Sequence, residues 1–165
     1  MALSQDSLEF HTNPKSFLDI TSQVQDFVIK SNIPNGVCTL FIKHTSASLV
    51  IQENYDPSVR QDFETIFSNL APEDFPYVHN MEGKDDMPAH IRSALTSTSE
   101  AVPVMNGKLS LGTWQGIYLW EHRDQKHNRI VMISMVGELG GTPNVSDSET
   151  EGVKVVPSKQ EDKEE

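Results

Sequence analysis

The sequence predicts an α+β domain built mainly from antiparallel β-sheet. Its strand patterns fall into groups with helical patterns between the groups, whereas a doubly wound fold would place a helix after every strand. The dipeptide Asn106-Gly107 joins two apolar segments, which indicates a tight hairpin because both central residues of a type I′ turn need positive φ. The 165 residues are enough for one domain with its own core.

The first third of the chain is expected to hold three strands and one helix. Alternating apolar residues predict a strand over 8–12, and helical spacing predicts a helix over 20–31 with Thr21 as its N-cap. Two further strands are predicted over 37–44 and 48–53. The small polar residues between these two strands allow a bulge or a corner as readily as a hairpin.

Two more helices are predicted in the middle of the chain. Asp56 can cap the first of them and Pro57 suits its first turn, and its apolar face continues to Leu70. Pro88 suits the first turn of the second helix, which is expected to end near Leu95.

The last strands complete the predicted sheet. The hairpin signal covers residues 101–111, and strands are predicted over 116–122 and 129–136, which we expect to form an antiparallel pair. The pattern then stops, so residues 1–137 are expected to form a single domain. Residues 138–165 carry a net charge of −5 and are predicted to be an acidic, disordered tail.

Charge excludes two classes of partner. The formal net charge is −11, and the 13 lysines and arginines are scattered rather than gathered in a stripe. Nucleic acids and anionic membranes need concentrated positive charge, so we expect neither as a partner. A small-molecule substrate remains the expected partner.

The compartment is expected to be the cytoplasm. No apolar run reaches the roughly 18–20 residues of a membrane span, and the first residues lack the basic and apolar regions of a signal peptide. The single cysteine, Cys38, cannot form an intrachain disulfide and is read as a buried core thiol rather than a nucleophile.

Residues 77–90 hold the densest set of possible metal ligands. This segment contains His79 and His90, and His44 ends an upstream strand. Three neutral imidazoles would leave an open position on a zinc-like ion, which is the catalytic rather than the structural arrangement. For His44 the alternative is a ring satisfied by a neighbouring carbonyl.

Three carboxylates lie in the same segment. Glu82, Asp85 and Asp86 can orient a histidine ring or act as a general base. They can equally form a solvated acidic loop in which Asp85 or Asp86 only caps the following helix.

A short downstream motif offers a platform for a flat ligand. In Gly112-Thr-Trp-Gln-Gly116, Trp114 can stack on a ring while Gln115 bonds its polar edge. A core tryptophan with a bulge at a glycine is an equally good interpretation. The other histidines have no clustered partners and are read as surface or core residues: His11, His122 and His127.

At these residues the sequence closely resembles the YjbQ-like family, also known as secondary thiamine-phosphate synthases. The family signature is met by Ser99, Val102, Val104, Gly107, Gly112, Thr113, Trp114, Gln115 and Ile117. His44-Thr-Ser-Ala47, Glu53-Asn54 and the segment from Glu82 to His90 also resemble the family. The resemblance spans roughly residues 5 to 137.

The resemblance implies a β-sandwich-like core, a homotrimer and a site near subunit boundaries. It implies a divalent metal ion, zinc or magnesium, on the positions that match the family's histidines: His44, His79 and His90. The implied activity joins a pyrimidine-methyl diphosphate to a thiazole phosphate. On that basis we expect Glu82 and Asp86 to be catalytic, and the expected substrate-binding residues are Thr45, Trp114 and Gln115.

Two other functions fit the same residues. A histidine-bound ion with an open position also suits hydrolysis of a phosphate or ester bond. A trimeric ligand-binding protein without turnover fits as well, because a ligand set does not establish a reaction.

Overall fold

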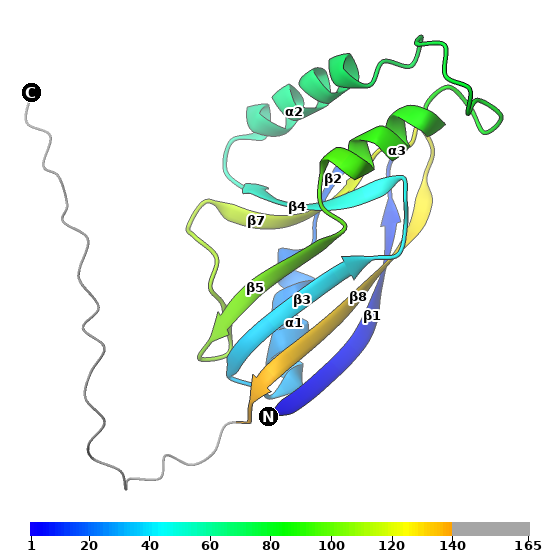
Figure 1. Cartoon of the computed structure of the whole chain (residues 1–165). Helices are drawn as coiled ribbons and strands as arrows, with labels where there is room; N and C mark the ends of the chain where they lie inside the picture. Colours follow the sequence, from blue (N-terminus) through cyan, green and yellow to red (C-terminus); the bar gives the residue numbers. More distant parts are fainter. Residues whose placement is uncertain (140–165) are drawn as a thin grey trace, which may run out of the picture.

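The computed structural model describes residues 1–139 as two antiparallel sheets and three helices (Figure 1). The strands are β1 (Ala2–Thr12), β2 (Phe17–Asp19), β3 (Asn35–Ile42), β4 (Ala47–Glu53), β5 (Ser99–Met105), β6 (Lys108–Leu109), β7 (Gln115–Glu121) and β8 (His127–Glu138). The helices are α1 (Thr21–Ser31), α2 (Pro57–Leu70) and α3 (Asp86–Leu95). One sheet has the order β1-β8-β3-β5-β6 and the other the order β2-β7-β4. The predicted α+β class is confirmed.

The main core lies between the two sheets and α1. Alternate residues of β3 point inward, so Cys38, Leu40 and Ile42 are buried while the residues between them face outward. Buried residues of the three-stranded sheet and of α1, such as Leu119 and Val24, belong to the same hydrophobic cluster. Burial raises the pKa of the Cys38 thiol to about 11, in agreement with its prediction as a core residue.

The second face of the small sheet is covered by α2 and α3 (Figure 1). Trp120 of β7 is fully buried there and stacks on Phe17, with ring centroids 4.3 Å apart. Phe63 and Phe67 of α2 pack edge-on against the same indole. This aromatic layer packs α2 against β7, and the loop that follows α2 leads to α3.

The predicted pairing of the last two long strands is wrong. β7 lies between β2 and β4, whereas β8 lies between β1 and β3 in the other sheet. Both are central strands, and each already has two antiparallel neighbours. The polar turn between them therefore carries the chain from one sheet to the other, and the buried ion pair of Glu121 with Arg129 joins the sheets at this crossing.

The connection between β3 and β4 is a corner, one of the two forms that were predicted. β3 ends at Ile42 in the large sheet and β4 begins at Ala47 in the small one. Residues 43–46 thus lie at the end of both sheets and beside α3, whose Ser93 donates a hydrogen bond to the Ala47 carbonyl.

Most helix boundaries and turns follow the predicted signals. Asp56 caps α2 through a 2.8 Å bond from the Ser58 amide, and Asn106 and Gly107 both have positive φ in the predicted hairpin. Thr21, however, does not cap α1. It is the first helical residue, and its hydroxyl instead accepts the amide of Ile117.

Among residues 1–139, no helix combines the length and the apolar character needed to cross a membrane. The predicted tail lies outside the described residues except at its start, where Glu138 still belongs to β8.

Candidate metal centre

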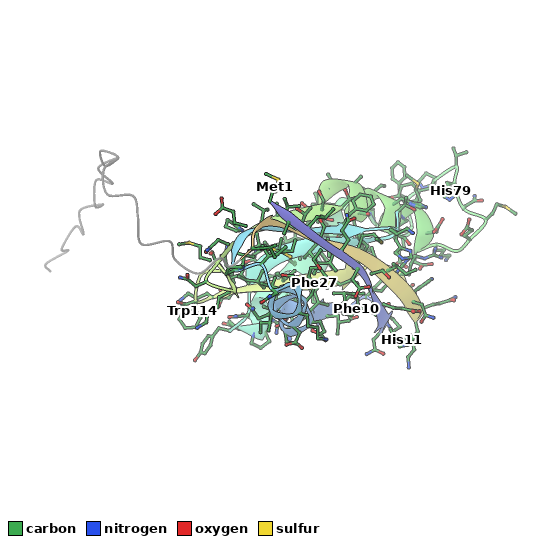
Figure 2. All side chains as sticks on the ribbon, turned by 90° about the horizontal axis from the view of Figure 1, so that it is seen from below. Met1, Phe10, His11, Phe27, His79 and Trp114 are labelled. Carbon is green, nitrogen blue, oxygen red and sulfur yellow. The ribbon has the colours of Figure 1, made fainter. Side chains whose placement is uncertain are left out.

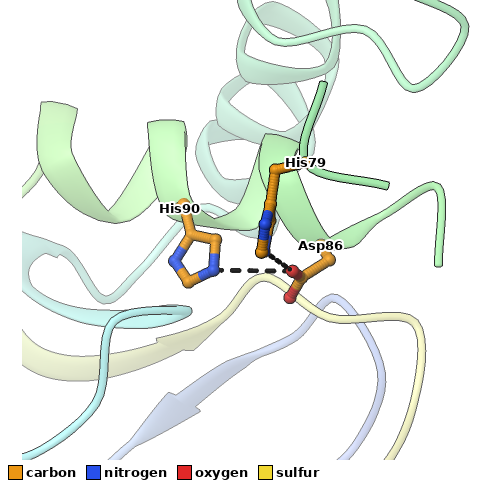
Figure 3. A group of neighbouring side chains, drawn as sticks. All are labelled: His79, Asp86 and His90. Carbon is orange, nitrogen blue, oxygen red and sulfur yellow. Dashed lines mark ion pairs between the residues drawn. The ribbon is translucent and has the colours of Figure 1, made fainter. Parts of the chain in front are cut away.

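Two possible ligands share one face of α3. Asp86 is the first residue of the helix and His90 follows one turn later, so the i, i+4 spacing brings their side chains together. His79 approaches the same point from the loop after α2 (Figure 3). One ligand atom from each of the three residues lies within 4.8 Å of the others, and no metal-competent group other than this one is found among residues 1–139.

The Asp86 carboxylate stands at the middle of this group. Its Oδ2 atom is 2.8 Å from His79 Nε2 and 3.5 Å from His90 Nε2. Only 2 % of the Asp86 side chain is exposed, and no donor within the described chain reaches Oδ2 with hydrogen-bond geometry. A buried carboxylate oxygen without a donor is costly, so this atom is suited to binding a cation.

The tautomer of His90 is fixed by a main-chain group. His90 Nδ1 is 3.0 Å from the Thr45 carbonyl oxygen, and a carbonyl can only accept, so Nδ1 carries the proton and donates it. In the neutral ring, Nε2 then presents its lone pair toward Asp86. A carbonyl that orients a histidine in this way is a common partner of metal-ligating imidazoles.

Arg123 anchors the acidic side of the group. Its guanidinium pairs with Asp86 Oδ1, donates to Asp85 Oδ2 at 2.7 Å and reaches the Glu82 carbonyl oxygen at 2.8 Å. Burial alone would raise the pKa of Asp85, but hydrogen bonds from the Asp124 amide and from Arg123 outweigh it, and the pKa is held below its usual value. Asp85 occupies the N-cap position of α3 without capping the helix, because its side chain accepts a hydrogen bond from Arg123 instead.

The sequence-based reasoning did not identify Arg123. It follows the end of β7 and lies far from residues 77–90 in the chain, so no local motif connects it with them. Gly83 belongs to the same anchor: its φ is +116°, and a Cβ there would come within 2.8 Å of Asp85 Oδ1.

Comparison with known proteins identifies the family. Residues 6–138 match the family model described as UPF0047 protein YjbQ-like. The chain belongs to the YjbQ-like (UPF0047) family. A UPF0047 protein of Synechocystis is 52 % identical over 136 residues, covering 82 % of this chain and 92 % of that protein. YjbQ of Escherichia coli O157:H7 is 41 % identical, covering 84 % of this chain and 96 % of its own.

Solved structures agree with this assignment. A protein from Sulfolobus solfataricus, described as YbjQ-like and of unknown function, matches with a TM-score of 0.74 at 27 % identity, over 83 % of this chain and all of the other. A YjbQ/UPF0047 protein of Clostridium acetobutylicum matches with a TM-score of 0.72 at 35 % identity, over 81 % of this chain and 99 % of its own.

The third histidine expected in the YjbQ-like site does not join the group. His44 lies at the corner after β3, and its Nε2 accepts a 2.8 Å hydrogen bond from the Ile130 amide. Partial burial, followed by the charge of Arg129, lowers its pKa. Thr45, the next residue, lines the same pocket as His44 and contacts His90 through its carbonyl oxygen.

The predicted aromatic platform lies far from this group. Figure 2 shows Trp114 and His79 at opposite ends of the molecule, and the seven-residue strand β7, roughly 20 Å long, lies between Trp114 and Arg123. Trp114 is 57 % exposed and packs edge-on against Tyr55, so it is not a core residue. Gln115 turns back and accepts the Gly112 amide at 2.8 Å.

The remaining expected residues lie on the surface or in the core. The Glu82 side chain is exposed on the loop beside His79. The main-chain carbonyl oxygen of Glu82 accepts a hydrogen bond from Arg123. His122, predicted as a surface or core residue, is buried and bonds Ser48 Oγ through Nε2 at 2.9 Å. Burial, together with the charge of Arg92, lowers the pKa of His122 to about 3, so its ring is neutral at pH 7.

Proposed function

We propose that this chain is a metal-dependent enzyme whose divalent ion is bound by His79, Asp86 and His90. The carrying observation is the buried Asp86 Oδ2 atom, which faces two imidazole nitrogens and has no hydrogen-bond donor within the described chain. Two imidazoles and one carboxylate form a donor set that suits zinc, whereas magnesium prefers oxygen ligands. The proposed set thus keeps two of the three expected histidines and puts a carboxylate in place of His44.

The reaction proposed first is the one implied by the family resemblance, the joining of a pyrimidine-methyl diphosphate to a thiazole phosphate. A divalent ion at this group would act as a Lewis acid toward the departing diphosphate. The Thr45 carbonyl holds the His90 ring, and Arg123 holds the carboxylate of Asp86. The exposed Glu82 side chain is free to orient a substrate that enters beside His79.

Hydrolysis of a phosphate or ester bond is the second candidate. Two histidines and one carboxylate with an open position are also the ligand pattern of metal-dependent hydrolases. In that case Glu82 is the nearby carboxylate available as a general base. Ligand binding without turnover is the alternative if neither reaction is observed.

The trimer is proposed from the outer face of the large sheet. Two apolar rows cross neighbouring strands there: Leu3, Val136 and Val37 are in register, and so are Met132 and Phe41. Each of these side chains is more than a third exposed in the single chain. Rows of this kind on a sheet face are suited to packing against further copies of the chain. Because Trp114 and His79 lie at opposite ends of the chain, the expected role of Trp114 in substrate binding requires a site shared between subunits.

One experiment tests the proposal. Metal content by plasma mass spectrometry and thiamine-phosphate formation are measured for the wild type, for His90→Ala and for the control His11→Ala, which removes an exposed histidine of β1. We expect zinc and turnover in the wild type and in His11→Ala, and loss of both in His90→Ala. A metal-free wild type, or equal turnover in all three proteins, would refute metal-dependent catalysis here. A panel of phosphoesters measured with the same variants distinguishes hydrolysis from transfer.

A further inference from the structure

The corner between β3 and β4 lines a cavity of about 540 Å³ that is separate from the three-residue group. Its polar lining residues are Lys43, His44, Thr45, Ser46, Thr98 and Arg129. None of its lining residues is acidic, although the chain as a whole carries a formal charge of −11. Glu121 lies outside this lining and neutralises Arg129, so among residues 1–139 Lys43 is the unpaired cation of the cavity and the remaining lining groups are mainly hydrogen-bond donors, a combination that favours an anionic ligand.

His44 presents a donor to this cavity rather than a lone pair. Its Nε2 accepts the Ile130 amide at 2.8 Å, and an amide can only donate. The proton of the neutral ring is therefore on Nδ1, and no acceptor for it is recorded among residues 1–139. Neither nitrogen is thus free as a metal ligand, but the Nδ1–H group is free to donate to an oxygen of a bound molecule.

Arg129 contributes a second donor from a buried position. Its side chain is only 4 % exposed, with Nε and Nη2 bound to Glu121 at 2.7 and 2.5 Å. Nη2 also donates a hydrogen bond to Ser46 Oγ at 3.1 Å. The Ser46 oxygen is the acceptor of this bond, so the Ser46 O–H group can donate a hydrogen bond to a ligand. Nη1 has no partner within the described chain, which leaves one nitrogen of a rigidly held guanidinium for the cavity.

We propose that this cavity is a phosphate subsite, which binds a phosphoryl or diphosphoryl group of a small-molecule substrate through His44 Nδ1–H, Arg129 Nη1 and the hydroxyls of Ser46 and Thr98, with Lys43 at the rim. A phosphoryl group has several acceptor oxygens that match this set of donors. The proposal gives His44 a substrate-binding role in place of the expected metal-ligating one.

The position of the subsite links it to the candidate metal centre. Thr45 lines the cavity, and its carbonyl oxygen is 3.0 Å from His90 Nδ1. A phosphoryl group held here would lie close to His90, which shares one face of α3 with Asp86. A role of this subsite in turnover rests on the proposed function, whereas the binding of phosphate by the subsite does not.

Binding of inorganic pyrophosphate tests the subsite without a metal. The full-length protein is treated with EDTA, and pyrophosphate is titrated by calorimetry into the wild type, Lys43→Gln and Thr98→Val, both of which change exposed residues. The matched control is Lys108→Gln, which removes a lysine from a different pocket, beside α1. We expect saturable binding by the wild type and the control, with about tenfold weaker binding in each test variant, as expected for one hydrogen bond to a charged group.

A second measurement reads His44 directly. Nitrogen-15 labelling of histidine distinguishes the two tautomers, and we expect the proton on Nδ1 with a shift of that signal when pyrophosphate is added. Absence of saturable binding, equal affinity of the test variants and the wild type, or a proton on Nε2 would overturn the subsite. A wild type that binds pyrophosphate but contains no zinc would instead overturn the proposed function and leave the subsite standing.

Discussion

The His90 ring is tied to the Thr45 carbonyl oxygen across 3.0 Å, so the corner between the two sheets determines which nitrogen of a helix residue faces Asp86. Without this bond the imidazole could present either nitrogen, and the group around Asp86 would have no fixed donor set. The sheet corner and the start of α3 therefore form one structural unit.

Replacing Asp86 with asparagine is expected to abolish metal binding while keeping the shape of the side chain. The amide removes the charge that the proposed ion needs, and we expect zinc affinity to fall by roughly 100-fold or more, beyond the range seen when only a supporting partner of a ligand is removed. Zinc competition with a fluorescent chelator measures the change. The control is Asp62→Asn on the exposed side of α2; a similar affinity in both variants would count against Asp86 as a ligand.

Replacing Arg123 is expected to destabilise the fold more than replacing Arg60. The change Arg123→Gln leaves the carboxylates of Asp85 and Asp86 buried without their cation, and breaking one side of a buried ion pair costs about 3–5 kcal/mol. Urea unfolding measures the free energy of unfolding. Arg60→Gln, which loses only partly exposed contacts to Tyr118 and Glu53, is the control. Equal losses in the two variants would show that Arg123 is not the anchor described here.

Stability is expected to fall in mild acid because of His122. Its pKa is about 3 in the folded chain against 6.5 as the ordinary value, so the unfolded state takes up a proton first as the pH falls. The stabilising contribution is complete above pH 6.5 and is lost toward pH 3, at about 1.4 kcal/mol per pH unit.

Between pH 7 and pH 5 the lowered pKa values of Asp85 and Glu121 do not yet act, and the lowered pKa of His44 contributes a slope of the same sign that is shared by the wild type and His122→Gln. We expect a shallower slope of the unfolding free energy against pH in His122→Gln than in the wild type. Equal slopes in the wild type and His122→Gln would contradict the assignment.

A charge on the outer face of the large sheet is expected to separate the proposed trimer. Phe41→Asp places a carboxylate in one of the two apolar rows, where burial against another copy would leave it unpaired. Light scattering after size exclusion should give three times the 18.5 kDa chain mass for the wild type and the single mass for the variant. Ile66→Asp, a similarly exposed residue of α2, should stay trimeric. A monomeric wild type would exclude the trimer.

Local signals predicted most helices and strands because their causes are local. Asp56-Pro57 starts α2 and Asn106-Gly107 turns the chain between β5 and β6, and both effects involve neighbouring residues only. The three-residue strand β2 is too short to show a period, and it was missed. The pairing of β7 with β8 was predicted wrongly because strand alternation says which face is buried but not which sheet receives the strand.

The candidate centre was visible in part. The sequence pointed to residues 77–90 and predicted Asp86 as a catalytic carboxylate rather than as a metal ligand. The spacing of Asp86 and His90 by four already places them on one helix face. The two histidines lie eleven residues apart, so their own spacing does not place them on one helix face. The roles of Arg123 and of the Ile130 amide depend on strand crossings and have no local signature.

The three residues of the candidate metal centre differ in conformational freedom. Asp86 and His90 are held by a helix and by Arg123 and Thr45, whereas His79 sits on a loop and is half exposed. Two of the proposed ligands are therefore held by neighbouring groups, and the loss of conformational entropy on binding an ion would fall mainly on the loop that carries His79. If the proposed ion binds here, we expect the mobility of the loop bearing His79 to set how long the ion stays.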